Sequence, residues 1–284
     1  MRCDRVLITL ITLSGCEWGG GNDAPANLLV PDAHASVDGR KADAAIDAAV
    51  DATMANPHHL LLTEVTLTPT GAEFIEITNP GLQPVDLTKY YLSDNGNYFK
   101  LPLGAPTISQ GDFIVQFPAA ATIAPGGVVT IATGTAAAFT TAYGAAPTYS
   151  IADATMLQTV INGTPSLTDG GEIVVLFQWD GTSMLVKDVD ILLAGAPNPI
   201  NGLVSKSGVT QGASTYATDL ETIPSQASAP AAGTSTKRIA AEIGHEKQLG
   251  TGNGIFGDDE TSEDTAVTWD SAFTAPTPGT VPAL

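Results

Sequence analysis

From residue 59 onward the chain consists of short segments in which apolar and polar residues alternate, and this pattern constrains the fold more than any other feature. A period of two is typical of β-strands, and Gly, Pro, Asn and Asp bound each segment. The dipeptide Asp180-Gly181 separates the last two segments and predicts a hairpin. The predicted strands are Leu60–Thr66, Glu73–Thr78, Tyr90–Ser93, Phe113–Phe117, Val128–Ala132, Glu172–Trp179 and Met184–Leu193.

Helices are not expected between these strands. No capped helical pattern of three turns occurs after residue 56. About seven strands at regular spacing, without alternating helices, favour an all-β fold, an antiparallel β-sandwich, over an α/β fold.

The first residues have the features of an exported leader. Arg2 and Arg5 precede the apolar run 6–13, which is too short to remain as a membrane-spanning helix. The sequence Leu13-Ser14-Gly15-Cys16 resembles the lipobox of bacterial lipoproteins. The resemblance implies that residues 1–15 are a signal peptide and that Cys16 carries a lipid anchor that contains palmitate. Glu17 replaces the Asp that often marks inner-membrane retention, so we expect the outer membrane, on its periplasmic or its exterior face.

Residues 16–56 are predicted to form a disordered, acidic, lipid-anchored tether. They are rich in Gly, Ala, Asp and Pro and poor in large apolar residues, so they cannot bury enough surface to offset the loss of chain entropy. Residues 198–236 have a similar composition and predict a flexible insertion.

Charge and cysteine content limit the partners and the means of stabilisation. The chain has a net charge of −19, which repels phosphate backbones and excludes nucleic acid as an expected partner. Its two cysteines are Cys3, in the leader, and Cys16. A domain after residue 56 therefore has no disulfide and depends on its core.

Seven segments follow one another in an order and spacing that are informative together. They are Leu62-Thr63-Glu64-Val65, Glu73-Phe74-Ile75-Glu76-Ile77-Thr78-Asn79-Pro80, Val85-Asp86-Leu87-Thr88, Tyr91-Leu92-Ser93-Asp94, Ile123-Ala124-Pro125-Gly126-Gly127, Asp169-Gly170-Gly171-Glu172-Ile173-Val174-Val175-Leu176 and Thr277-Pro278-Gly279. Together they resemble a lamin tail domain. The resemblance implies an immunoglobulin-like β-sandwich over 57–284 and carries no catalytic residues with it, while the insertion at 198–236 departs from the family pattern.

The densest acidic cluster is the candidate metal site. Five carboxylates occur within seven residues, at Asp258, Asp259, Glu260, Glu263 and Asp264. Closely spaced oxygen ligands suit calcium, which would be the cofactor, although the spacing is not that of an EF-hand loop. The alternative is a solvated acidic loop.

Other motifs predict structure rather than chemistry. The string Gly252-Asn253-Gly254-Ile255-Phe256-Gly257 has the Gly-x-Gly-x-x-Gly spacing, but it runs into acids that would repel phosphate, so we interpret it as a turn. None of the four histidines has the paired spacing of a zinc site: His34, His58, His59 and His245. Packing is the default role for Trp179, Trp269 and Phe273, and sugar stacking is the alternative.

These observations lead to three hypotheses about function. The first is a non-enzymatic binding or adhesion module of the cell envelope, displayed on the lipid anchor and contacting an envelope or extracellular protein or polysaccharide. The second is a metal-dependent hydrolase that uses the carboxylates of 258–264. The third is a purely structural envelope protein.

Overall fold

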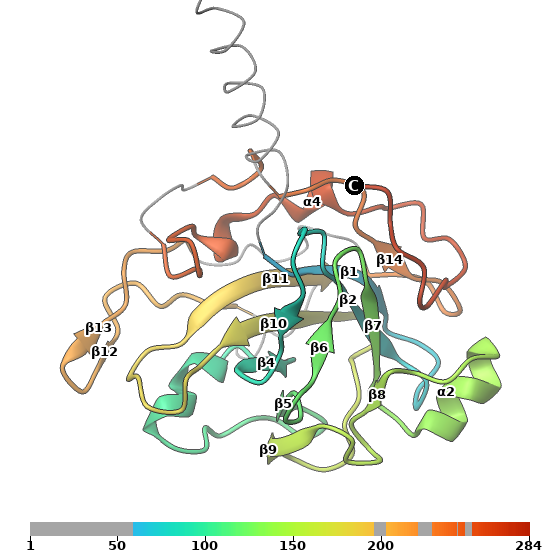
Figure 1. The fold of residues 1–284 in the computed structure, drawn as a ribbon, viewed down its shortest axis with the longest axis horizontal. Helices are drawn as coiled ribbons and strands as arrows, with labels where there is room; N and C mark the ends of the chain where they lie inside the picture. Colours follow the sequence, from blue (N-terminus) through green and yellow to red (C-terminus); the bar gives the residue numbers. More distant parts are fainter. Residues whose placement is uncertain (1–58, 196–202, 221–228, 243, 248–251) are drawn as a thin grey trace, which may run out of the picture. The chain divides into compact units, whose positions relative to one another are not determined.

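The computed structural model describes residues 59–195, 203–220, 229–242, 244–247 and 252–284. These residues form two five-stranded sheets (Figure 1). The predicted signal peptide, Cys16 and the tether lie outside the described residues.

The second sheet is antiparallel throughout, and the first sheet is antiparallel except for one short pair of strands. The first sheet has the order β14 (Thr236–Lys237), β1 (Leu61–Thr66), β2 (Phe74–Thr78), β7 (Val128–Ala132) and β8 (Tyr149–Ser150), and only its β7–β8 pair is parallel. The second sheet has the order β11 (Lys187–Gly195), β10 (Gly171–Gln178), β4 (Tyr90–Ser93), β5 (Phe113–Gln116) and β9 (Leu157–Ile161). Two short pairs complete the strands: β3 (Val85–Asp86) with β6 (Thr122–Ile123), and β12 (Thr210–Gln211) with β13 (Ser214–Thr215).

The seven predicted strands are confirmed as β1, β2, β4, β5, β7, β10 and β11, with shifts of a few residues at their ends. The predicted hairpin is confirmed because β10 and β11 pair antiparallel. Its connection is longer than a two-residue turn, since the last register pair joins Gln178 to Lys187. Asp180 organises this loop by accepting hydrogen bonds from the backbone N–H groups of Thr182 and Ser183 at 2.8 and 2.6 Å.

The main core lies between the two sheets. Alternate residues of β1, β2 and β7 meet alternate residues of β4, β5, β10 and β11, as in the packed faces of a sandwich. Members of this core include Leu62, Ile75, Ile131, Phe113, Val174 and Leu192.

The second sheet is also covered on its outer face. The 3₁₀-helix η1 (Tyr98–Leu103) and residues 203–216 pack there, against Ile173, Val175 and Phe177 of β10. Burial on both faces explains why β10 is continuously apolar from residue 173 to 177 instead of alternating.

The segment predicted as a flexible insertion differs from that expectation where the structure describes it. Val204, Lys206, Tyr216 and Ser235 are buried. Residues 203–220 therefore contribute to a core, and Thr236 begins the edge strand β14.

The part of the chain that the structure describes has three more helical segments: α2 (Ala136–Tyr143), η2 (Glu260–Ser262) and α4 (Thr265–Thr268). Phe139 of α2 packs on Phe74 and covers the outer face of the first sheet (Figure 1). Among the described residues, no helix has the length and hydropathy needed to cross a bilayer.

Candidate functional site

A buried cluster of charged side chains connects the first sheet with the C-terminal segments. Arg238 follows β14 and is held over β1, because its backbone N–H donates to the Thr63 carbonyl and its Nε donates to the Leu62 carbonyl. Its guanidinium donates two hydrogen bonds of 2.8 Å to the carboxylate of Asp190 in β11, and Nη1 donates to Glu263 Oε1 at 2.7 Å. The guanidinium also contacts Trp269, whose ring centroid lies 5.1 Å from the guanidinium carbon.

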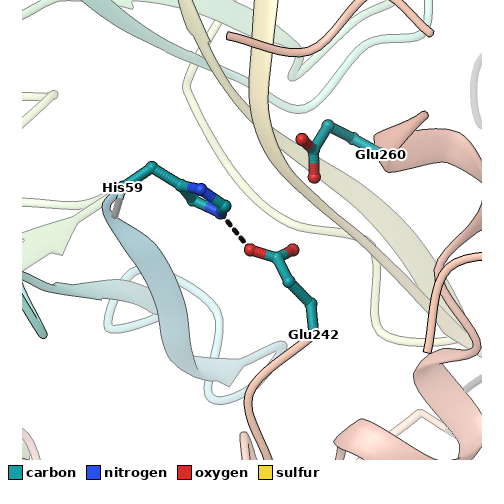
Figure 2. A group of neighbouring side chains, drawn as sticks. All are labelled: His59, Glu242 and Glu260. Atoms are coloured by element: carbon teal, nitrogen blue, oxygen red, sulfur yellow. Dashed lines mark hydrogen bonds and ion pairs between the residues drawn. The ribbon is translucent and has the colours of Figure 1, made fainter. Parts of the chain in front are cut away.

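Next to Arg238, three further titratable side chains converge (Figure 2). His59 lies two residues before the start of β1, Glu242 lies in the segment after Arg238, and Glu260 begins η2. One ligand atom from each residue lies within 4.8 Å of the others, and His59 Nε2 is hydrogen-bonded to Glu242 Oε1. All three side chains are buried, with exposed fractions of 8, 0 and 3%.

Each of these three residues also has a buried polar atom without a hydrogen-bond partner among the described residues. These atoms are His59 Nδ1, Glu242 Oε2 and Glu260 Oε2. Buried polar atoms are nearly always satisfied, so unpartnered atoms on three neighbouring side chains indicate a missing ligand or proton.

Electrostatic interactions in the cluster are strong. Burial, and then the charges of Glu242 and Asp190, raise the pKa of Glu260 well above its ordinary value. Burial disfavours the ionised forms of His59 and Glu242, but their mutual attraction outweighs it, raising the pKa of His59 and lowering that of Glu242. The arrangement therefore favours positive charge between these side chains.

The five carboxylates predicted to bind calcium do not face one another as a single group. Asp259 accepts hydrogen bonds from the N–H groups of Leu220 and Thr261, and Glu263 binds Arg238. Asp264 lies 3.8 Å from Lys247, and Asp258 is partly exposed. Glu260 lies close to His59 and Glu242, whereas Glu263 lies close to Asp190 and Glu242, so the two glutamates belong to different sets of possible metal ligands. Calcium binding by the five residues together stays a prediction.

The sequence did not identify His59 and Glu242 as neighbours. They are 183 residues apart, and neither belongs to a motif with metal-ligand spacing. The pairing of β1 with β14 and the hydrogen bonds of Arg238 to Thr63 and Leu62 bring the start of the domain close to residue 242.

The glycine string at 252–257 forms the predicted turn and positions Glu260. Gly252 N–H donates to the Gly257 carbonyl at 2.7 Å, and Gly254 N–H donates to the Asp258 carbonyl at 2.8 Å. A Cβ at Gly254 would lie 2.6 Å from Glu260 Oε1, so a larger residue there would displace that carboxylate. The string leads into the three-residue η2 and not into the long helix of a dinucleotide site.

A surface cleft of about 560 Å³ lies on the other side of the same turn. The β10–β11 loop, β13 and the turn line it, largely with uncharged groups such as Ser183, Thr215 and Asn253. A smaller depression of about 230 Å³ contains Trp179 and shares Ser183, Leu185 and Lys187 with the cleft.

The three aromatic side chains considered for sugar stacking differ in position. Trp269 is buried in the main core, which confirms the packing role. Trp179 follows the inner strand β10 and packs partly buried against the outer core of the second sheet, and its Nε1 donates to the Ser183 carbonyl at 2.8 Å. Phe273 is partly exposed.

Residues 53–191 match the Lamin Tail Domain family. This part of the chain is therefore similar to a lamin tail domain. The match confirms the resemblance and the immunoglobulin-like all-β sandwich, and lamin tail domains are typically non-catalytic. It ends in β11, so the terminal Thr277-Pro278-Gly279 segment lies outside it.

A solved structure of a DUF4876 family protein from Bacteroides thetaiotaomicron VPI-5482 is similar to this chain, with 14% identity and a TM-score of 0.41. The similarity covers 80% of this chain and 75% of that protein. No curated protein matches the chain.

Proposed function

We propose that this chain is a non-catalytic binding or adhesion module of the cell envelope, displayed on a lipid anchor at Cys16. The observation that carries the proposal is the open cleft beside the β10–β11 loop of a lamin tail domain. Its lining offers hydroxyl, amide and backbone groups and one lysine. Such groups suit a neutral polar ligand, and we take an envelope polysaccharide as the ligand class.

A blocking substitution tests the cleft. Thr215 is exposed on β13 and lines the cleft. Thr215→Trp should fill it and reduce binding of envelope polysaccharide to the purified chain by at least about tenfold, equivalent to about 1.4 kcal/mol. The matched control is Thr141→Trp on the exposed surface of α2. Equal binding by both variants would exclude the cleft as the binding site.

A second experiment tests the anchor. Because Cys16 is the only cysteine that the lipobox resemblance places at the cleavage point, Cys16→Ser should move the protein from the membrane to the soluble fraction after cell fractionation. Outer-membrane placement should appear in the same fractionation of the unaltered chain. Retention of the Cys16→Ser variant in the membrane would contradict lipid anchoring.

A further inference from the structure

The buried cluster around Arg238 contains more acidic than basic groups. Four buried carboxyl groups lie there, on Asp190, Glu242, Glu260 and Glu263. Against them stand Arg238 and, when protonated, His59. Burying an ionised group without a partner is very unfavourable, so a cluster of this composition requires a cation or bound protons.

Arg238 already satisfies two of the four carboxyl groups. It donates hydrogen bonds to Asp190 and Glu263. Together with Glu242, these two residues form one of two sets of side chains that are close enough to bind a common metal ion. A guanidinium therefore occupies the place that a metal would need in that group. The second group, with Glu242, Glu260 and His59, has no guanidinium between its members, and all three of its unpartnered atoms are buried.

We propose that His59, Glu242 and Glu260 bind one divalent transition-metal ion of the zinc class. Their ligand atoms lie within 4.8 Å of one another, so small shifts of the side chains bring all three to one ion at typical zinc–ligand distances of about 2.0–2.2 Å. The ion would offset two of the negative charges and provide a partner for buried atoms that have none.

The imidazole ligand decides between metal classes. Calcium and magnesium prefer all-oxygen sites, whereas zinc and related ions bind imidazole nitrogen together with carboxylate oxygen. Burial of the three side chains leaves little access for a substrate, which favours a structural ion over a catalytic one.

The ion would fasten the domain at one point. His59 precedes β1, whereas Glu242 and Glu260 lie beyond the lamin tail match, which ends at residue 191. A shared ion would therefore connect the start of the lamin tail domain with the C-terminal segments, in a chain whose two cysteines both lie at or before residue 16. Such a connection stabilises the folded state because an unfolded chain does not preform the site.

The test is zinc binding by the purified full-length chain after removal of metals with a chelator. One Zn²⁺ per chain should bind in competition with a chromophoric chelator. At about a hundredfold excess over the dissociation constant, Zn²⁺ should raise the melting temperature by about 5–10 °C. Calcium should produce no comparable rise.

Two variants and two controls locate the site. His59→Ala and Glu260→Gln should each weaken Zn²⁺ binding by at least about a hundredfold. This loss exceeds the usual effect of removing a residue that only orients a metal ligand. His245→Ala and the double variant Asp258→Asn with Asp264→Asn should bind as the unaltered chain does, because these residues lie outside the group. Glu260→Gln retains the shape of a neutral carboxylic acid, so it should fold even if His59→Ala does not.

Three results would overturn the proposal. The first is an unaltered chain that shows no stabilisation by Zn²⁺ even in excess, which would mean that bound protons offset the charge of the cluster instead of a metal ion. The second is unchanged Zn²⁺ binding by Glu260→Gln. The third is loss of binding only in the Asp258 and Asp264 double variant, which would place the ion in the acidic loop.

Discussion

At the scale of single residues, two buried glutamates fix the end of the chain to the first sheet. Glu64 and Glu76 face each other across β1 and β2. Glu64 accepts hydrogen bonds from the N–H and hydroxyl of Thr277, at 2.9 and 3.2 Å, and Glu76 accepts one from the Gly279 N–H at 2.7 Å. These hydrogen bonds explain why the Thr277-Pro278-Gly279 segment occurs together with the segments 62–65 and 73–80, which contain the two glutamates.

Glu76 makes a testable contribution to the dependence of stability on pH. Burial raises its pKa from 4.5 to about 7, against the hydrogen bond from Gly279. The folded state thus binds a proton more tightly than the unfolded state. The stabilisation is complete below the unfolded pKa and is lost as pH rises to about 7, with a total of up to about 3 kcal/mol.

We therefore expect Glu76→Gln to remove part of the fall in melting temperature between about pH 5 and pH 8. The measurement is a series of thermal melts of both proteins across that range. Asp86→Asn serves as the control, because Asp86 is exposed and its pKa is lowered, which places its effect at more acidic pH. Identical slopes for Glu76→Gln and the unaltered chain would show that Glu76 is ionised throughout.

Residue-scale inference from sequence was partly successful. The period-two pattern of the predicted strand 73–78 places Glu73 and Glu76 on opposite faces, and the structure buries both. By contrast, the group of His59, Glu242 and Glu260 could not be predicted. Its members lie before β1, after β14 and at the start of the short helix η2. The sequence has no periodicity in these segments that would fix their relative positions.

At the scale of elements, a buried ion cluster attaches residues 203–220 to β11. Lys206 Nζ lies 2.6 Å from Asp188 Oδ2 and 2.8 Å from Asp219 Oδ2, and it donates to the Tyr98 hydroxyl at 3.2 Å. Burial favours the neutral amine, but the two aspartates outweigh it and raise the pKa of Lys206. The lysine therefore remains charged in the core.

Removing this one cation should leave two buried carboxylates without a positively charged partner. Lys206→Met should lower the free energy of unfolding by about 3–5 kcal/mol, measured by urea denaturation. Lys187→Met, at an exposed position of β11, should change it by less than about 0.5 kcal/mol. Adding Asp188→Asn and Asp219→Asn to Lys206→Met should recover part of the loss. No loss in Lys206→Met alone would contradict the role of the cation.

The elements missed by sequence reasoning are short or lie at edges. The edge strand β9 is exposed over Leu157–Thr159, so it lacks the alternation that marks a half-buried strand. The helix α2 has eight residues, fewer than the three turns needed for a clear period, although Thr135 caps it by accepting a hydrogen bond from Ala138. Its attachment depends on Phe139, which packs against Phe74 and Tyr143.

We expect Phe139→Ala to lower the free energy of unfolding by about 3–5 kcal/mol, because the ring is fully buried and its removal leaves a cavity. Urea denaturation provides the measurement. The control is Ala137→Gly on the exposed side of the same helix, which should cost only about 1 kcal/mol through helix propensity. Equal losses in both variants would mean that α2 contributes no packing to the sheet.

At the scale of the whole molecule, the family match and the folded unit have different lengths. The match ends at residue 191, but the structure places later residues inside the same sandwich. β14 pairs with β1 along its free edge, Arg238 neutralises Asp190, and Trp269 belongs to the main core. The C-terminal third therefore completes the β-sandwich in this chain.

A chain that ends after Gly195 should consequently fail to fold stably. It would lack the side chains that cover β1 and the outer face of β10, exposing Leu60, Val175 and Phe177 to water. Far-ultraviolet circular dichroism and limited proteolysis should show loss of cooperative unfolding and rapid cleavage. The matched control ends after Gly279, which retains the hydrogen bonds to Glu64 and Glu76 and should melt close to the full chain. A cooperative, protease-resistant product from the shorter chain would show instead that residues 53–191 suffice, with the C-terminal segments acting as an addition to a domain that is stable without them.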